Sequence, residues 1–244
     1  MSDAVVACNL TKRFEGGCTA LDNVNVRVGF NEVYCLLGTN GAGKTTAINL
    51  MLGFLEPTSG SVHVCGVDVA KDPHEARRRI AYVPENVQLY PMLTAIENLR
   101  LFTRLATGQT LNSYQYAELF QAVGLDDSNL TKPLRFLSKG SRQKVGLAMA
   151  LARNASVLLL DEPTSGLDPR DASEVVETLL SIRNKGRALF IVTHDIFRVN
   201  MLADRLGVLV RGRLAVETTR CGIPTDGLYD WYMDAVNTWK PSVC

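Results

Sequence analysis

Short apolar runs bounded by turn-forming residues predict a series of β-strands along the chain. Residues 4–10 form the first run, and residues 19–29 alternate apolar with polar positions, as an antiparallel strand with one solvated face does. Residues 33–37 and 157–160 are apolar without alternation, which is typical of parallel strands covered on both faces. Further strand-like runs occupy residues 61–65, 80–83, 188–192 and 206–210.

Helical periodicity replaces the strand pattern between residues 91 and 153. Thr94 precedes Glu97 by three positions, the spacing of a capping box that opens a helix. Apolar residues then recur at helical spacing, with no strand-like run among them. We therefore predict a helical insertion in an α/β fold. Shorter helices are predicted at residues 47–52, at residues 74–79 and from about Asp195.

A glycine-rich stretch stands between the predicted strand at 33–37 and the predicted helix at 47–52: Gly38-Thr39-Asn40-Gly41-Ala42-Gly43-Lys44-Thr45-Thr46. Its spacing is that of the phosphate-binding loop, GxxxxGK followed by Ser or Thr. The glycines let main-chain N–H groups converge on phosphate oxygens at a helix N-terminus. Lys44 would reach the β- and γ-phosphates, and the Thr45 hydroxyl would bind Mg2+. The alternative is an accidental glycine-rich turn, which the flanking strand and helix argue against.

Asp161 and Glu162 follow the most apolar strand of the chain. In phosphate-loop proteins a carboxylate at this place lies near Mg2+, and the next one could polarise an attacking water. Two acidic residues opening a turn before Pro163 would be the simpler interpretation without the phosphate loop. His194 ends the next predicted strand and would reach the same edge of the sheet.

Composition excludes several other classes of protein. Among 244 residues, 46% are hydrophobic and 21% charged, and the net charge of +1 gives no basic field for nucleic acid. The six cysteines lack metal-ligand spacing, so a zinc site is not expected. No apolar stretch approaches the ~18 residues of a membrane span, and no signal-peptide pattern opens the chain. We expect a cytosolic chain that does not itself cross a membrane.

Three further motifs complete an ordered set. Leu137–Gln143 lies ahead of the carboxylate strand, Thr164–Asp168 follows it, and Val192–Asp195 closes the next strand. With these motifs in this order, the sequence resembles the ATPase subunit of ABC transporters from about residue 4 to residue 217. The resemblance implies a P-loop NTPase fold of the α/β class, with an antiparallel β subdomain and a tail at 221–244. The RecA-like core would comprise residues 1–90 and 154–220, and the helical subdomain residues 91–153.

The resemblance also implies a role for each motif. Phe14 would stack on the adenine of ATP, and Glu162 would be the catalytic base. The phosphates would be bound by the loop, through Gly38, Asn40, Gly41, Gly43, Lys44, Thr45 and Thr46. Mg2+ would be held by Thr45, Glu85 and Asp161. His194 would lie near the γ-phosphate. Ser138 and Gly140, in the signature motif, would cap the γ-phosphate of the nucleotide held by the opposite subunit, and Asp168 would belong to the D-loop.

The sequence departs from the family pattern at two places. Glu85 stands where the family usually has glutamine, and a carboxylate can bind Mg2+ but cannot donate a hydrogen bond to water. The signature, normally LSGGQ, carries Lys139 and Ser141 in place of Gly and Gln. Residues 82–91 and the signature look like the bacterial ABC-2-type exporter branch.

These features predict an ATP-hydrolysing subunit that closes head-to-tail, as a homodimer or with a homologous ATPase subunit. Motion would pass through residues 85–90 to a separate transmembrane permease subunit, with the chain peripheral on the cytoplasmic face of the inner (cell) membrane. A soluble ABC-type ATPase acting on nucleic acid or ribosomes is the main alternative, although no second cassette or basic extension is visible. A phosphate-loop kinase or GTPase would leave Leu137–Gln143 unexplained. A neighbouring gene encoding membrane spans would discriminate among them.

Overall fold

Two β-sheets form the centre of the protein, seen in a computed structural model that describes residues 3–224 and 227–238. The smaller sheet is antiparallel, with strand order β2-β1-β4-β5. Its strands are β1 (Asp3–Arg13), β2 (Thr19–Gly29), β4 (Ser59–Val64) and β5 (Val67–Asp68). The alternation at residues 19–29 is confirmed, because the inward-facing positions of β2 are buried and the others contact solvent.

The larger sheet has the strand order β10-β9-β3-β8-β7-β6. Five of its strands are parallel, and β10 pairs antiparallel with β9. The strands are β3 (Val33–Leu37), β6 (Ile80–Val83), β7 (Val157–Asp161), β8 (Ala188–Thr193), β9 (Arg205–Val210) and β10 (Arg213–Thr219). All of β3 is buried, as its unalternated apolar run predicts, and β8 is buried along its whole length as well.

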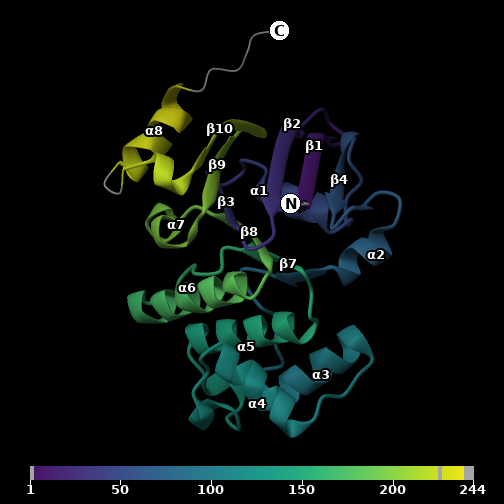
Figure 1. The fold of residues 1–244 in the computed structure, drawn as a ribbon, viewed down its shortest axis with the longest axis vertical. Helices are drawn as coiled ribbons and strands as arrows, with labels where there is room; N and C mark the ends of the chain where they lie inside the picture. The colour runs from purple at the N-terminus through teal and green to yellow at the C-terminus, as the bar shows by residue number, and fades with distance from the viewer. Residues whose placement is uncertain (1–2, 225–226, 239–244) are drawn as a thin grey trace.

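The helices divide into two groups (Figure 1). One group gathers at the end of the molecule away from β1 and β2: α3 (Ala95–Thr107), α4 (Ser113–Ala122) and α5 (Lys139–Ala152). The other group lies nearer the sheets: α1 (Lys44–Met51), α2 (Pro73–Arg78), α6 (Pro169–Asn184), α7 (Ile196–Leu202) and α8 (Leu228–Thr238). Within the described residues, no helix combines the length and apolar character needed to cross a membrane.

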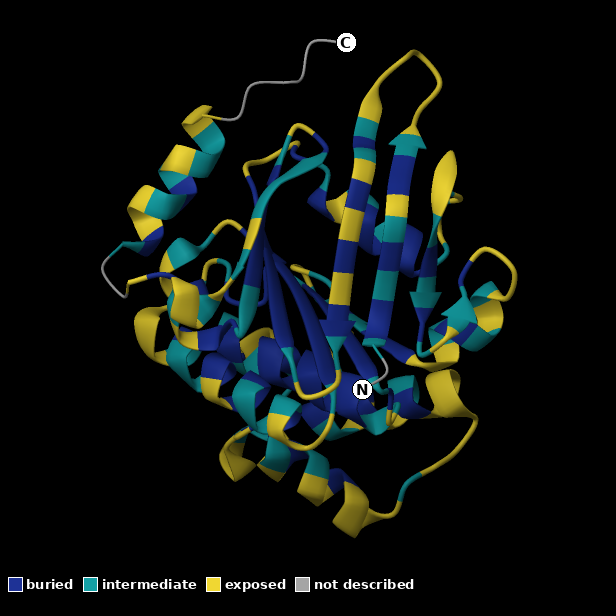
Figure 2. Ribbon diagram, turned by 45° about the horizontal axis from the view of Figure 1, so that its top comes forward, coloured by how far each residue is buried: buried dark blue, intermediate teal, exposed yellow. Residues whose placement is uncertain are grey.

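The parallel sheet separates two hydrophobic cores, with its buried strands at the centre of Figure 2. On one face, α5 and α6 pack against the sheet while α3 and α4 pack on α5, in a core that includes Leu99, Phe120 and Leu158. On the other face, α1 and the antiparallel sheet enclose a second core, in which Tyr34 and Phe190 stack with ring centroids 5.7 Å apart. The ends of the strands are thereby held in fixed positions beside α1.

Most predicted elements are confirmed, and among the described residues two strands and two α-helices were missed. The capping box at Thr94 and Glu97 is present, and Thr94 caps α3. The sequence interpretation did not include β5, β10, α6 or α8. The helix α8 packs against β9 and β10 through buried Leu228 and Tyr232, so part of the predicted tail at 221–244 belongs to the folded protein.

Candidate functional site

The glycine-rich loop connects β3 to α1, and two of its glycines fit spaces that a side chain would fill. Gly43 precedes α1 with φ at 110°, a left-handed conformation that favours glycine. A Cβ atom there would overlap the carbonyl oxygen of Ala20. A Cβ atom at Gly38 would lie 2.7 Å from the carbonyl oxygen of Leu209. The loop is therefore pressed against both sheets, and its N–H groups precede the N-terminus of α1.

The side chain of Lys44 folds back over the loop and is buried. Its Nζ atom donates hydrogen bonds to the carbonyl oxygens of Gly38 at 2.6 Å and Thr39 at 3.3 Å. It also lies 3.9 Å from Oε1 of Glu162. Burial lowers the pKa of Lys44, while the nearby carboxylates of Glu162 and Asp161 oppose this effect. The ammonium is thus desolvated and available to an anion entering the loop.

Glu162 follows the C-terminal end of β7 and is held by the end of β8. The Thr193 hydroxyl donates a hydrogen bond to Oε2 of Glu162 at 2.8 Å, and Nδ1 of His194 lies 2.7 Å from Oε1. The backbone of Glu162 has φ at 47°, a left-handed conformation that is uncommon outside glycine and clusters at functional sites. The carboxylate is buried and fixed in orientation.

Three carboxyl groups approach one another beside the loop. Burial raises the pKa of Asp161, and the neighbouring carboxylates of Glu162 and Glu85 raise it further. Burial raises the pKa of the neighbouring Tyr82 to about 12, and the charge of Asp161 adds to this effect. Such crowding of negative charge is the environment that a bound cation would relieve.

These groups line one pocket of about 470 Å3, a volume typical of small-molecule sites. The pocket brings together the predicted loop residues with Glu85, Asp161 and Glu162. It also includes residues that sequence reasoning missed: Cys18, Thr19, Ala20, Arg211 and Gly212. They come from the start of β2 and the turn after β9, and no motif marks them, because only the packing of the two sheets brings them here.

The donor set in this pocket fits a hard divalent cation. The Thr45 hydroxyl and the carboxylates of Glu85 and Asp161 line the same space. In the described part of the chain, no three His, Cys, Asp or Glu side chains are placed to hold a metal by themselves. Mg2+ is usually bound by one or two carboxylates together with substrate phosphates and waters, and Thr45, Glu85 and Asp161 would be the residues of this pocket that hold it.

Other predicted site residues lie outside this pocket. Phe14, in the turn after β1, does not line it and is 39% exposed, with Nζ of Lys12 at 5.3 Å from the ring centroid. The side chain of His194 contacts Glu162 but is 57% exposed. Ser138 and Asp168 line a different hollow, of about 700 Å3, between α5 and α6.

At that second hollow, the signature residues begin α5 and Asp168 begins α6. The Ser138 hydroxyl accepts a hydrogen bond from the N–H of Ser141 at 3.0 Å and donates one to Oδ2 of Asp171 at 3.2 Å. Asp168 accepts hydrogen bonds from the N–H groups of Arg170 and Asp171, both at 2.9 Å. A Cβ atom at Gly140 would overlap the Asp171 carboxylate, so glycine is required for this close approach.

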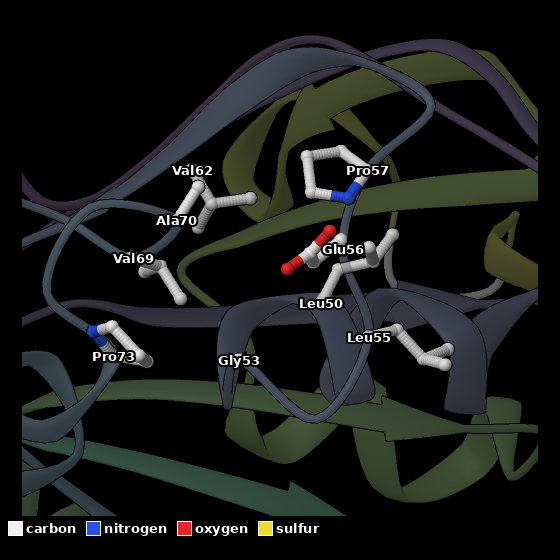
Figure 3. A pocket seen from close by; sticks show the side chains of 9 residues that line it. All are labelled: Leu50, Gly53, Leu55, Glu56, Pro57, Val62, Val69, Ala70 and Pro73. Carbon is white, nitrogen blue, oxygen red and sulfur yellow. The ribbon is translucent and has the colours of Figure 1, made fainter.

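A third hollow lies between α1, β4 and the turn before α2 (Figure 3). Its volume is about 50 Å3, which is too small for a nucleotide. The lining is mainly apolar, with Glu56 as its acidic side chain. None of the predicted site residues lies here. The predicted loop residues line the pocket around the glycine-rich loop, which is the candidate site for a phosphate ligand.

Comparison with known proteins identifies the family. The family model described as ABC transporter matches residues 21–165. A bacitracin transport ATP-binding protein of Bacillus licheniformis is 34% identical over 229 residues, covering 93% of this chain and 72% of the relative. A daunorubicin resistance ATP-binding protein of Streptomyces coeruleorubidus is 34% identical, over 90% of this chain and 69% of the relative.

Solved structures agree with these sequence relatives. An ATP-binding subunit of an ABC transporter has a TM-score of 0.79 at 29% identity, covering 94% of this chain and 99% of that one. An ATP-binding cassette solved as a dimer in a post-hydrolysis state with ADP and Pi has a TM-score of 0.77 at 27% identity, covering 88% and 98%. The chain belongs to the ABC transporter family, as an ATP-binding and ATP-hydrolysing cassette with the P-loop NTPase fold.

Proposed function

We propose that the chain is the motor subunit of a bacterial ABC-2-type exporter. Two copies, or this chain and a homologue, close head-to-tail on two Mg-ATP molecules, and hydrolysis reopens them. The resulting motion passes through residues 85–90 to a separate permease subunit in the membrane, with the cassette on its cytoplasmic face. Export is supported by the relatives named for bacitracin transport and daunorubicin resistance.

The observation that carries the proposal is the separation of Ser138 from the phosphate pocket. Within one chain, the Ser138 hydroxyl and the N-terminus of α5 open onto the hollow between α5 and α6. The phosphate pocket is lined by Lys44 and Glu162 instead. One chain therefore lacks donors on the far side of the γ-phosphate, and a second chain placed head-to-tail supplies them where negative charge develops.

Within the pocket, each side chain has a distinct proposed task. Lys44 exchanges its hydrogen bond to Gly38 for the β- and γ-phosphate oxygens, and the N–H groups that begin α1 bind the same oxygens. Glu162, oriented by Thr193 and His194, accepts the proton of the attacking water. Thr45, Glu85 and Asp161 would hold Mg2+, which would offset the charge of the phosphates.

Phe14 has a separate proposed role at the base of the nucleotide. Its ring is exposed in the turn that follows β1, and β1 pairs with β2. The first residues of β2 line the mouth of the phosphate pocket. A base lying against this surface would stack on Phe14, as aromatic rings do with one another.

Co-purification from membranes of the source cell tests this function. A tagged Glu162→Gln chain, solubilised with Mg-ATP present, is expected to retain a partner with several membrane-spanning segments. A tagged Lys44→Ala chain, which should bind little ATP, is the control. It is expected to retain less of the membrane partner than the Glu162→Gln chain does. Recovery of ribosomes or nucleic acid with the Glu162→Gln chain, and of no membrane protein, would contradict the proposal.

A further inference from the structure

Ser165, in the turn after β7, contacts residues from two distant parts of the chain. Its hydroxyl donates a hydrogen bond to Oε1 of Glu85 at 2.9 Å. Its main-chain carbonyl oxygen accepts one from Nζ of Lys139 at 2.5 Å. Glu85 lines the phosphate pocket, and Lys139 is the first residue of α5, next to Ser138. A continuous chain of polar contacts therefore runs from the phosphate pocket to the N-terminus of α5.

The approach of Lys139 depends on Gly166. This residue has φ at 63°, and a Cβ atom on it would lie 2.8 Å from Nζ of Lys139. A side chain at position 166 would strain the backbone at this φ and would require the flexible end of Lys139 to shift. The turn is shaped to accept Lys139, which is partly buried at this contact.

Both ends of this chain of contacts are places where the sequence departs from the family pattern. Glycine at position 139 would have no side chain to reach Ser165, so the contact with α5 requires the lysine. Glutamine at position 85 could accept a hydrogen bond from Ser165, but a carboxylate accepts it more strongly. The link is thus a feature of this chain's own residues.

We propose that Glu85, Ser165 and Lys139 form a bridge that couples the chain's own phosphate pocket to the placement of Ser138, with Lys139 as a positioning residue. This inference rests on the proposed function, in which Ser138 faces the partner's nucleotide. The Glu85 carboxylate has two alternative partners, the Ser165 hydroxyl and the contents of the pocket. If the Glu85 carboxylate contacts bound Mg-ATP instead, the Ser165 hydroxyl loses its hydrogen-bond acceptor. The turn whose carbonyl binds Lys139 can then move.

The coupling is reciprocal, because two ligands that shift the same two-state element must affect each other equally. Capture of Ser138 by the partner's nucleotide orders α5 and, through Lys139, the turn at Ser165. That in turn favours one position of Glu85. The bridge therefore gives each chain a means of sensing whether both nucleotides are in place.

Amide hydrogen exchange in the nucleotide-free protein tests the bridge itself. The N–H of Ser165 donates to the Glu162 carbonyl at 3.0 Å, and that of Leu167 donates to the Thr164 carbonyl at 3.3 Å. Loss of the charged donor in Lys139→Met is expected to speed exchange at both amides about tenfold. Lys139→Arg keeps a charged donor and should stay near the wild-type rate.

Lys132→Met is the matched control, since Lys132 lies in the same helical part of the molecule and its Nζ donates a hydrogen bond to Oδ1 of Asn129 at 3.2 Å rather than to the turn at Ser165. It should leave exchange at Ser165 and Leu167 unchanged. Wild-type exchange in Lys139→Met would overturn the bridge, whatever the ATPase activity of the protein. This result is independent of the proposed function, because neither nucleotide nor a second chain is present.

The coupling is tested in a Glu162→Gln background, where ATP should hold two chains together. Lys139→Met is expected to leave the ATP affinity of the monomer within about twofold and to weaken dimerisation about tenfold, and Lys139→Arg should restore it. Unchanged dimer affinity, or an equal loss of ATP affinity, would overturn the positioning role. Absence of an ATP-dependent dimer with Lys139 intact would instead overturn the proposed function on which the coupling rests.

Discussion

Nδ1 of His194 lies 2.7 Å from Oε1 of Glu162, while the Thr193 hydroxyl bonds Oε2 of the same carboxylate at 2.8 Å. Both oxygens of Glu162 are thus held by the end of β8, the strand paired with β7. A carboxylate that is buried, fixed and next to a phosphate pocket has the placement expected of a general base. The pairing of two neighbouring parallel strands, rather than any local motif, produces this contact.

Replacing Glu162 by glutamine should stop turnover and preserve nucleotide binding. The amide keeps the shape of the side chain but cannot accept the proton, and loss of a general base typically costs ~10^2–10^4-fold in rate. An ATP-dependent dimer should then appear in size-exclusion chromatography, which the wild type forms only transiently. Hydrolysis at the wild-type rate in this variant would show that another group is the base.

Replacing Lys44 by alanine should remove most of the ATP affinity without unfolding the protein. The change deletes a charged donor to the β- and γ-phosphates, worth about 10- to 100-fold in binding. Calorimetric titration with ATP measures the loss, and Lys71→Ala, on the exposed surface beside Asp68, is the matched control. Near-normal affinity in Lys44→Ala would count against the phosphate-loop assignment.

Asp161→Asn should stabilise the nucleotide-free protein at neutral pH. Folding raises the pKa of Asp161 through burial and nearby carboxylates, so the folded state disfavours its charge. The resulting free-energy cost to folding is fully present at pH values above the raised folded-state pKa of Asp161. It disappears as the pH falls below the pKa of this side chain in the unfolded state. Thermal unfolding at pH 7 should therefore show a higher Tm for the variant, with the difference shrinking in acid.

Glu97→Gln provides the opposite case for the same measurement. Hydrogen bonds from Thr94 lower the pKa of Glu97, so its charged form is favoured by folding. Removing that charge should lower Tm at pH 7, and the loss should shrink as the pH falls through the lowered pKa. A change in Tm of the same sign at pH 7 for the Asp161 and Glu97 variants would contradict the electrostatic description of the pocket.

Cys18 provides a direct report on occupancy of the pocket. Its thiol is exposed and lies at the pocket mouth, whereas Cys221 is exposed but lies outside it. Mg-ATP should slow alkylation of Cys18 by a maleimide and leave that of Cys221 unchanged, as measured by mass spectrometry of peptides. Equal protection of both thiols would indicate a global change rather than a ligand in the pocket.

The fold was predictable from the sequence wherever an apolar run or a helix-capping motif was clear. The unalternated runs predicted buried β3 and β7, a strand-like run predicted β8, and the capping box predicted the start of α3. Strand β5 has only two residues, and β10 is half-buried along most of its length, so neither leaves a clear pattern. Helix α6 did carry signals that were missed, namely Asp168 as N-cap, Pro169 at the first position and apolar residues at helical spacing.

The candidate site was predictable as far as each motif is local. The phosphate loop and the Asp161-Glu162 pair could be identified from spacing and a preceding apolar strand. The contribution of Cys18 and Arg211 to the same pocket depends on how two sheets pack, which no short pattern encodes. The contact between Lys139 and Ser165 spans 26 positions and arises from the packing of α5 against the turn after β7.

The shared site is the central claim, and mixing two inactive variants tests it most directly. Lys44→Ala damages the phosphate loop, and Ser138→Arg damages the signature that faces the partner's nucleotide. In a head-to-tail dimer of one chain of each kind, both lesions fall on one site and the second site is intact. The mixture should therefore recover part of the wild-type ATPase rate, while each variant alone stays inactive. A mixture that stays inactive although heterodimers are demonstrated, or a wild-type monomer whose specific rate is independent of concentration, would contradict the shared site.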